Sequence, residues 1–219
     1  KLFFGSAGRK KRSELAFRVQ ELALESEVIE ITAEEIDQTL NKRPTDNLNY
    51  LELRYIAEML TKLTSNEIIV DTLSKPQYSH KYLTKHLKQL NSQLLIKTES
   101  CGSENCHFHV RLADITSKRI IISKKADQKF PVVSAASCLA KYMRDQHLRD
   151  IEEEWDFPLF SLGSGYPNEN DPQVISFLQT HRNEIQNHDF PFIRYSWSWP
   201  PLQQIIGSTP KPLDEYFNK

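Results

Sequence analysis

The sequence predicts an α/β fold, because amphipathic helical segments alternate with short apolar runs typical of buried strands. The chain has 219 residues, of which 39% are hydrophobic and 26% charged. A sizeable core is therefore expected and disorder is not. No stretch approaches the roughly 18 consecutive apolar residues of a membrane span, so no membrane association is expected.

The first half of the chain is predicted to hold several helices around one buried strand. Helices are expected over residues 12–25, 49–63 and 78–90, and from Thr32, which forms a capping box with Glu35. Residues 27–32 alternate between polar and apolar, as a short strand does. Residues 67–71 form an apolar run that ends in Asp71, which is typical of a buried strand.

The second half repeats the alternation. Strands are expected over residues 94–97 and 118–123, on either side of a polar excursion, and helices over 132–148 and 172–184. Residues 192–199 are aromatic and are expected to be extended. Residues 201–219 contain prolines and turn residues, so we predict a flexible tail that leaves a domain of residues 1–200.

Charge is unevenly distributed although the net charge is only −1. Residues 75–145 hold thirteen Lys or Arg against five acids. Such a segment can face a polyanion, but a solvated helix face explains the charge equally well.

Three cysteines are too few for a disulfide scaffold, so a reducing compartment is expected: the cytoplasm, or the nucleus in a eukaryote. Cys101, Cys106, His107 and His109 offer four zinc ligands in nine residues. Because adjacent Cys106 and His107 cannot easily bind one ion, a solvated hairpin loop is the alternative.

Two acids are candidates for metal chemistry. Asp71 ends an apolar strand, and Asp127 lies just before a helix that starts with small residues. Together they could share Mg²⁺, which uses few carboxylates and leaves positions for phosphate oxygens and water. The alternative for Asp71 is an N-cap of the next segment.

A tight loop, Gly163 to Pro167, holds an aromatic hydroxyl at Tyr166. Tyr166 could stack on a sugar or donate a hydrogen bond to a hydroxyl group. Turn geometry alone would also explain the two glycines, Gly163 and Gly165.

Several of these segments, in order, resemble ribonuclease HII of the archaeal and eukaryotic branch. The resemblance lies in residues 126–145, 163–167 with Asp171-Pro172, 193–197 and 69–72, and more weakly in 11–15 and 32–37. It implies a ribonuclease H-like mixed sheet flanked by helices, with a helical C-terminal part from about residue 145. It also implies cleavage of the RNA strand of RNA–DNA hybrids and of single ribonucleotides embedded in DNA.

The resemblance assigns roles to particular residues. Asp71 and Asp127 match two of four carboxylates that bind two divalent ions, Mg²⁺ or Mn²⁺. Tyr166, with Gly165 beside it, matches the tyrosine that senses the ribose 2′-hydroxyl. The basic residues expected near the hybrid are Lys124, Lys141 and Arg144. Of these, Lys141 and Arg144 are expected either to be structural or to contact the backbone of the hybrid.

The family's opening strand carries Asp-Glu-Ala-Gly-Arg-Gly, with the other two carboxylates, and this sequence has no such motif. Gly5 to Arg9 shares three of its letters but neither acid. We expect the missing strand upstream of residue 1. The alternative is a catalytically inactive chain that binds the hybrid or is tethered to a clamp.

Near the end of the chain, Leu213, Tyr216 and Phe217 stand at i, i+3 and i+4. One helical turn would place them on one side as a hydrophobic plug. This resembles the sliding-clamp-binding box of replication and repair proteins, although Pro210 takes the place of its usual glutamine. The alternative is that the three residues fold back on the domain.

Overall fold

A computed structural model describes residues 5–42, 47–72, 74–111, 117–156 and 172–207. These residues divide into two compact units. One is drawn from Gly8–Ile29 and Asn47–Met143, and the other from Lys1–Ala7, Glu30–Asp46 and Arg144–Lys219. No helix in the described ranges is both long and apolar enough to cross a bilayer.

The first unit contains a four-stranded sheet. Its strands are β1 (Glu67–Thr72), β2 (Leu95–Cys101), β3 (Asn105–Arg111) and β4 (Lys118–Lys124), in the order β1-β4-β3-β2. β1 runs parallel to β4, whereas β3 is antiparallel to both β4 and β2. The sheet is therefore mixed, as predicted, and β1 and β2 are its outer strands among the described residues.

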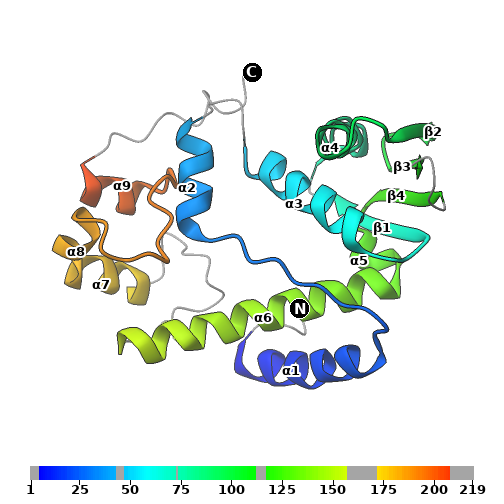
Figure 1. Ribbon diagram of the computed structural model, residues 1–219. Helices are drawn as coiled ribbons and strands as arrows, with labels where there is room; N and C mark the ends of the chain where they lie inside the picture. The colour runs from blue at the N-terminus through cyan, green and yellow to red at the C-terminus, as the bar shows by residue number, and fades with distance from the viewer. Residues whose placement is uncertain (1–4, 43–46, 73, 112–116, 157–171, 208–219) are drawn as a thin grey trace. The chain divides into compact units, whose positions relative to one another are not determined.

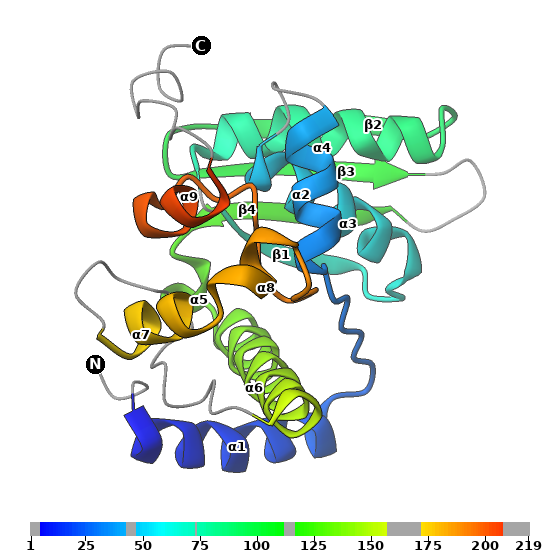
Figure 2. The ribbon, with the colours of Figure 1, turned by 90° about the vertical axis from the view of Figure 1, so that its left-hand side faces the viewer.

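Helices α3 (Leu48–Lys62) and α4 (Pro76–Leu90) pack against one face of this sheet (Figures 1 and 2). The shared core consists of Leu53, Ala57, Leu60, Leu83 and Leu87 from the helices and Val70, Cys106, Phe108, Val110, Ile120 and Ile122 from the strands. Because strand side chains alternate between faces, Asp71 next to Val70 lies on the face away from α3 and α4.

Most predicted helices are confirmed. α1 spans Gly5–Leu22 and α2 spans Ala33–Lys42, and the Thr32 hydroxyl accepts the Glu35 amide at 3.1 Å, as the capping box requires. Short α5 (Ala126–Lys129) follows β4, and α6 (Pro131–Trp155) extends seven residues beyond the predicted end at Leu148.

The strand predicted over residues 27–32 is wrong, because no strand forms there. Val28 is 47% exposed and Ile29 and Ile31 are only half-buried, so no side chain of this segment is fully buried in a core. Side-chain bonds hold this part of the chain instead: Glu25 accepts the Thr64 amide at 3.0 Å and its hydroxyl at 2.8 Å.

The second unit contains α2, α7 (Pro172–Thr180), α8 (Arg182–Gln186) and α9 (Pro200–Ile206). The single helix predicted over 172–184 is thus broken at His181. Residues 192–199 form turns rather than an extended segment. Their aromatic side chains join a core of Val174, Leu178, Ile185, Phe190, Trp199 and Leu202.

The tail predicted from residue 201 does not begin there. α9 is a helix that starts with two prolines at its N-terminus, where their missing amides leave no helical bond unmade. Leu202 is 3% exposed within the core of the second unit. Residues 208–219 lie outside the described ranges.

Candidate active site

The carboxyl ends of β1 and β4 meet at one edge of the sheet. The two strands are parallel, and Asp71 pairs in register with Ser123, while Thr72 pairs with Lys124. β4 then leads directly into α5, which carries Asp127 in its first turn. Parallel pairing therefore brings two acids, 56 residues apart in sequence, to the same end of neighbouring strands.

A backbone contact holds Asp71 beside this turn. The Asp71 carboxylate accepts a hydrogen bond from the amide of Ala126 at 2.9 Å, and Ala126 is fully buried. Asp127 is the next residue and is half-buried. The N-cap role considered for Asp71 is thus partly correct: the carboxylate bonds an amide at the start of a helix, but that of α5 rather than α4.

The turn between β4 and α5 depends on Lys125, whose backbone lies in the left-handed region at φ 52°. A non-glycine residue there is uncommon and marks a tightly determined turn. Lys129 reaches back to donate to the Ser123 hydroxyl at 3.2 Å. The left-handed turn at Lys125 and the hydrogen bond from Lys129 to Ser123 therefore constrain the chain before and after Asp127.

Lys124 is engaged with a carboxylate. Its ammonium group donates to Glu104 at 2.9 Å, in the turn between β2 and β3. This hydrogen bond, together with the charge of Lys124, holds the pKa of Glu104 below its ordinary value. Both side chains are exposed to solvent, so the pair contributes little to stability.

The two basic residues expected on the long helix have local partners. Lys141 donates to the Ser137 hydroxyl at 2.8 Å, one turn earlier on α6. Arg144 donates to the Asp145 carboxylate at 2.8 Å, and Asp145 is buried. Whether the two residues are structural or contact the backbone of the hybrid stays a prediction.

Five predicted site residues lie outside the described ranges. They are Gly165 and Tyr166 of the tyrosine loop and Leu213, Tyr216 and Phe217 of the clamp-binding box. Of the predicted catalytic and metal-binding residues, the structure therefore describes both, Asp71 and Asp127.

Comparison with known proteins gives the family. A family model described as Ribonuclease HII matches residues 92–199. Ribonuclease HII of Methanothrix thermoacetophila is 30% identical over 191 residues, covering 86% of this chain and 72% of the relative. That of Methanosarcina barkeri is 31% identical over 198 residues, with the same two coverages. The chain belongs to the ribonuclease HII family. At the level of the family, it is a ribonuclease.

A eukaryotic relative and a solved structure extend this result. One ribonuclease H2 subunit from Arabidopsis thaliana is 36% identical over 94 residues, covering 41% of this chain and 30% of the relative. The structure of the PCNA:RNase HII complex from Archaeoglobus fulgidus matches with a TM-score of 0.58 at 22% identity. It covers 94% of this chain and 78% of that one, which shows that the ribonuclease HII fold is shared.

The polar excursion in this ribonuclease HII chain is a hairpin of β2 and β3, not a zinc cluster. Cys101 and Cys106 face each other across the hairpin and form a disulfide. Cys106 is fully buried in the core, whereas His107, the next residue, lies on the opposite face of the sheet. The four proposed ligands are therefore divided between two faces.

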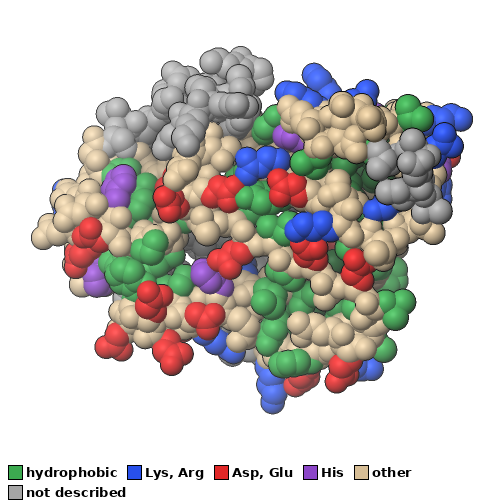
Figure 3. All heavy atoms as spheres, in the orientation of Figure 1, with side chains coloured by type: hydrophobic (Ala, Val, Ile, Leu, Met, Phe, Trp, Pro, Cys, Tyr) green, Lys and Arg blue, Asp and Glu red, His purple; other side chains and the backbone are tan. Residues whose placement is uncertain are grey.

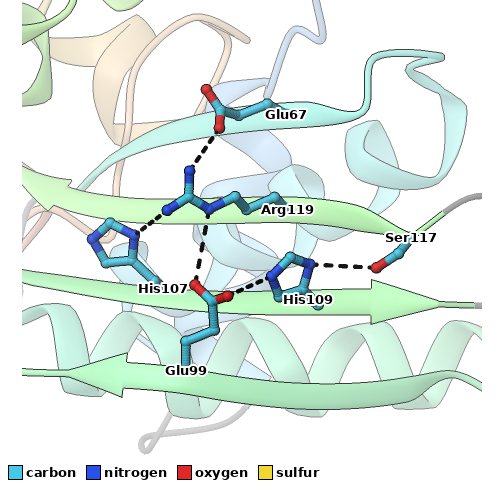
Figure 4. A network of polar contacts seen from close by, with 6 residues as sticks. All are labelled: Glu67, Glu99, His107, His109, Ser117 and Arg119. Carbon is cyan, nitrogen blue, oxygen red and sulfur yellow. Dashed lines mark hydrogen bonds and ion pairs between the residues drawn. The ribbon is translucent and has the colours of Figure 1, made fainter.

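The two histidines belong to a polar network on the face away from α3 and α4 (Figure 4). His109 lies 2.8 Å from Glu99 and 3.3 Å from the Ser117 hydroxyl. Arg119 lies 3.0 Å from Glu67 and 3.4 Å from His107. Hydrogen bonding from His109 lowers the pKa of Glu99, as does the charge of Arg119. The carboxylates of Glu99 and Glu67 therefore already have histidine and arginine partners.

Among the residues that the structure describes, no group of three His, Cys, Asp or Glu side chains is arranged to hold a metal. Asp71 at the end of β1 and Asp127 in α5 have suitable chemistry, because carboxylate oxygens are preferred ligands of Mg²⁺ and Mn²⁺. An ionised carboxylate has about four lone-pair sites, so the Ala126 bond leaves Asp71 capacity for a metal.

Two contacts of the site are not predicted by the sequence: the hydrogen bond from the Ala126 amide to Asp71, and the one from Lys124 to Glu104. The amide carries no side-chain signal at all. Glu104 could have been found only by recognising the hairpin, whose signal is the alternation of apolar Cys106, Phe108 and Val110 with polar residues.

Proposed function

We propose that this chain is the ribonuclease HII-type endonuclease that cleaves the RNA strand of RNA–DNA hybrids, including single ribonucleotides embedded in DNA. The observation that carries the proposal is that Asp71 ends β1 while Asp127 lies in the first turn of α5, directly after the parallel partner strand β4. The Ala126 amide, which donates to the Asp71 carboxylate, belongs to the residue directly before Asp127.

Asp71 and Asp127 are proposed to hold divalent Mg²⁺ or Mn²⁺. When bound, such ions activate a water and stabilise the departing 3′-oxygen during displacement at phosphorus. The role of Asp71 is to present an ionised oxygen whose direction is fixed by the Ala126 bond. Asp127 is proposed to complete the pair from the first turn of α5.

Two carboxylates neutralise only half the charge of two divalent ions, so further acids are required. β1 is an outer strand of the described sheet, and its outer edge is open to pair with one more strand. We propose that the acid pair of the family's opening strand enters the site by this pairing. Such a strand would stand directly beside Asp71.

Recognition of the ribonucleotide is assigned to Tyr166, with Gly165 allowing close approach of the 2′-hydroxyl. Lys124, the last residue of β4 and three residues before Asp127, is proposed to exchange its Glu104 contact for a phosphate. Lys141 and Arg144 are proposed to support α6 through Ser137 and Asp145.

Paramagnetic Mn²⁺ provides a test of the acid pair that does not depend on catalysis. In a ¹⁵N-labelled sample of residues 1–219, Mn²⁺ should broaden the amide signals of residues 69–72 and 124–130 first. Asp71→Asn and Asp127→Asn should each weaken this broadening, and Asp150→Asn, an exposed acid on α6, should not. Unchanged broadening in both site variants would refute the proposed ligands.

Cleavage requires the complete acid set. The experiment adds an upstream strand containing Asp-Glu-Ala-Gly-Arg-Gly, and compares it with a matched strand carrying Asn-Gln at the acid positions. The substrate is a DNA duplex with one embedded ribonucleotide. Metal-dependent cleavage by the acidic form alone is the expected result. Cleavage by neither form would instead favour a chain that binds without cutting, which the ribonuclease names of its relatives do not support.

A sliding clamp is the protein partner proposed for the tail. The Archaeoglobus fulgidus protein of similar fold was solved in complex with PCNA. Leu213, Tyr216 and Phe217 have the spacing of a clamp-binding plug. Such a contact would place the nuclease on replicated DNA, where embedded ribonucleotides occur.

A further inference from the structure

The exposed surface of α4 carries a row of positive charges. Lys81, Lys85 and Lys88 stand at i, i+4 and i+7, which places them on one side of the helix, and α4 contains no acidic residue. All three are exposed. In Figure 3, Lys and Arg side chains gather at the upper right, over α4 and β2.

The row borders a groove between α4 and β2. The groove has a volume of about 570 Å³ and is lined by the three lysines together with His80, Thr84, Gln89, Ile96 and Thr98. His80 bonds the Thr98 hydroxyl at 3.1 Å and packs edge-on against Phe108, so the groove has a fixed floor. The Gln89 side-chain amide and the lysine ammonium groups can donate hydrogen bonds to phosphate oxygens, whereas the Thr84 hydroxyl already donates to the His80 carbonyl at 2.8 Å.

Within the ranges that the structure describes, none of the three lysines forms an ion pair with a carboxylate. Their contacts are with aromatic rings: Lys81 lies 5.4 Å from the Tyr82 ring centre and Lys85 lies 5.6 Å from that of Tyr50. Like charges spaced four residues apart on a helix repel one another, so a bound polyanion would relieve an unfavourable interaction.

The dimensions suit a nucleic-acid strand. Seven residues of helix rise about 10 Å, and a strand of duplex DNA carries one phosphate for about every 3.4 Å of axis. The row is therefore long enough to contact more than one phosphate of the same strand. A single free phosphate would engage only one or two of the lysines.

We propose that the groove between α4 and β2 binds the phosphate backbone of a nucleic-acid strand, independently of base sequence and of ribonucleotides. The groove adjoins β2, at the opposite edge of the sheet from β1, and α4 covers the face from which Asp71 points away. It is thus a second nucleic-acid contact, beyond the proposed cleavage site, that retains the protein on DNA between cleavage events.

The test measures binding of residues 1–219 to a labelled DNA duplex without ribonucleotides, in EDTA, over roughly 50 to 200 mM salt. The variant Lys81→Gln, Lys85→Gln, Lys88→Gln should bind about 10- to 100-fold more weakly at low salt, with a salt slope reduced by about 2 to 3. The corresponding triple Arg variant should retain affinity, and Lys62→Gln, on α3, should change little.

Equal affinity and salt slope for the triple Gln variant and the unaltered chain, with both folded by circular dichroism, would overturn the proposal. So would displacement of the duplex by orthophosphate at matched ionic strength, which would identify a site for small phosphates. Because the assay contains neither metal nor ribonucleotide, its outcome is separate from that of the Mn²⁺ and cleavage experiments.

Discussion

The carboxylate of Asp71 and the backbone amide of Ala126 are joined by a hydrogen bond of 2.9 Å between groups 55 residues apart. This bond ties the end of β1 to the first turn after β4. The acid proposed as a metal ligand is therefore also a structural residue, and the two roles can be separated by substitution.

Asp71→Asn should keep an oxygen that accepts the Ala126 amide, whereas Asp71→Ala leaves that buried amide without its partner. We expect Asp71→Ala to lower the free energy of unfolding by about 1–3 kcal/mol, and Asp71→Asn by less than half of that. Urea denaturation checks the difference. If Asn and Ala destabilised the chain equally, the bond would have no structural importance.

Asp37 should be the main polar anchor of the second unit. Its carboxylate accepts the Tyr195 amide at 2.7 Å, the Ser196 amide at 3.1 Å and the Ser196 hydroxyl. We expect Asp37→Ala to destabilise this unit by about 2–4 kcal/mol.

Tryptophan fluorescence suits the measurement, because all three tryptophans, Trp155, Trp197 and Trp199, lie in or against the core of that unit. Glu34→Gln, exposed on the same helix, is the control and should change stability by less than about 0.5 kcal/mol. An unfolding curve for Asp37→Ala that overlies that of the control would contradict the prediction.

Cys106 and Cys101 should respond differently to serine. Either substitution removes the disulfide, but Cys106 is fully buried in the core while Cys101 is exposed. Cys106→Ser should therefore be less stable than Cys101→Ser by about 1–3 kcal/mol, the cost of a buried hydroxyl. A zinc cluster would predict similar losses for both, and a loss of stability of the unaltered chain in EDTA.

His80 should make stability depend on pH. Burial lowers the pKa of His80 below its ordinary value of 6.5, so the unfolded chain takes up the proton first as the pH falls. The stabilisation due to neutral His80 is full above pH 6.5 and is lost as the pH falls through the lower folded pKa.

The unaltered chain should therefore lose more stability than His80→Gln when the pH is lowered from 7.5 through 6.5. Gln preserves a partner for the Thr98 hydroxyl without titrating. Denaturation midpoints of both proteins at several pH values give the comparison, and parallel curves would show that His80 titrates alike in the two states.

A peptide of residues 207–219 should bind the sliding clamp of the same organism at tens of micromolar or tighter. Leu213→Ala with Phe217→Ala should abolish the binding, since both side chains belong to the proposed plug. Calorimetric titration measures both peptides. Retention of binding by the double variant would reject the proposed clamp box.

The sequence alone determined the local structure where one chemical pattern dominated. The helical spacing of α3 and α4, the capping box at Thr32 and the apolar run of β1 all predicted the elements that form. Ordered motifs also indicated the family. These signals are local or cumulative along the chain, so they need no knowledge of what packs against what.

Only the tertiary structure decided which alternating segments become strands and which acids meet. Residues 27–32 also mix polar and apolar side chains, but β3 has neighbours on both edges and a core beneath Phe108, while Val28 faces solvent. The meeting of Asp71 with the turn before Asp127 depends on pairing between distant strands. A strand forms only with a partner, because its amides and carbonyls must be satisfied by another segment of chain.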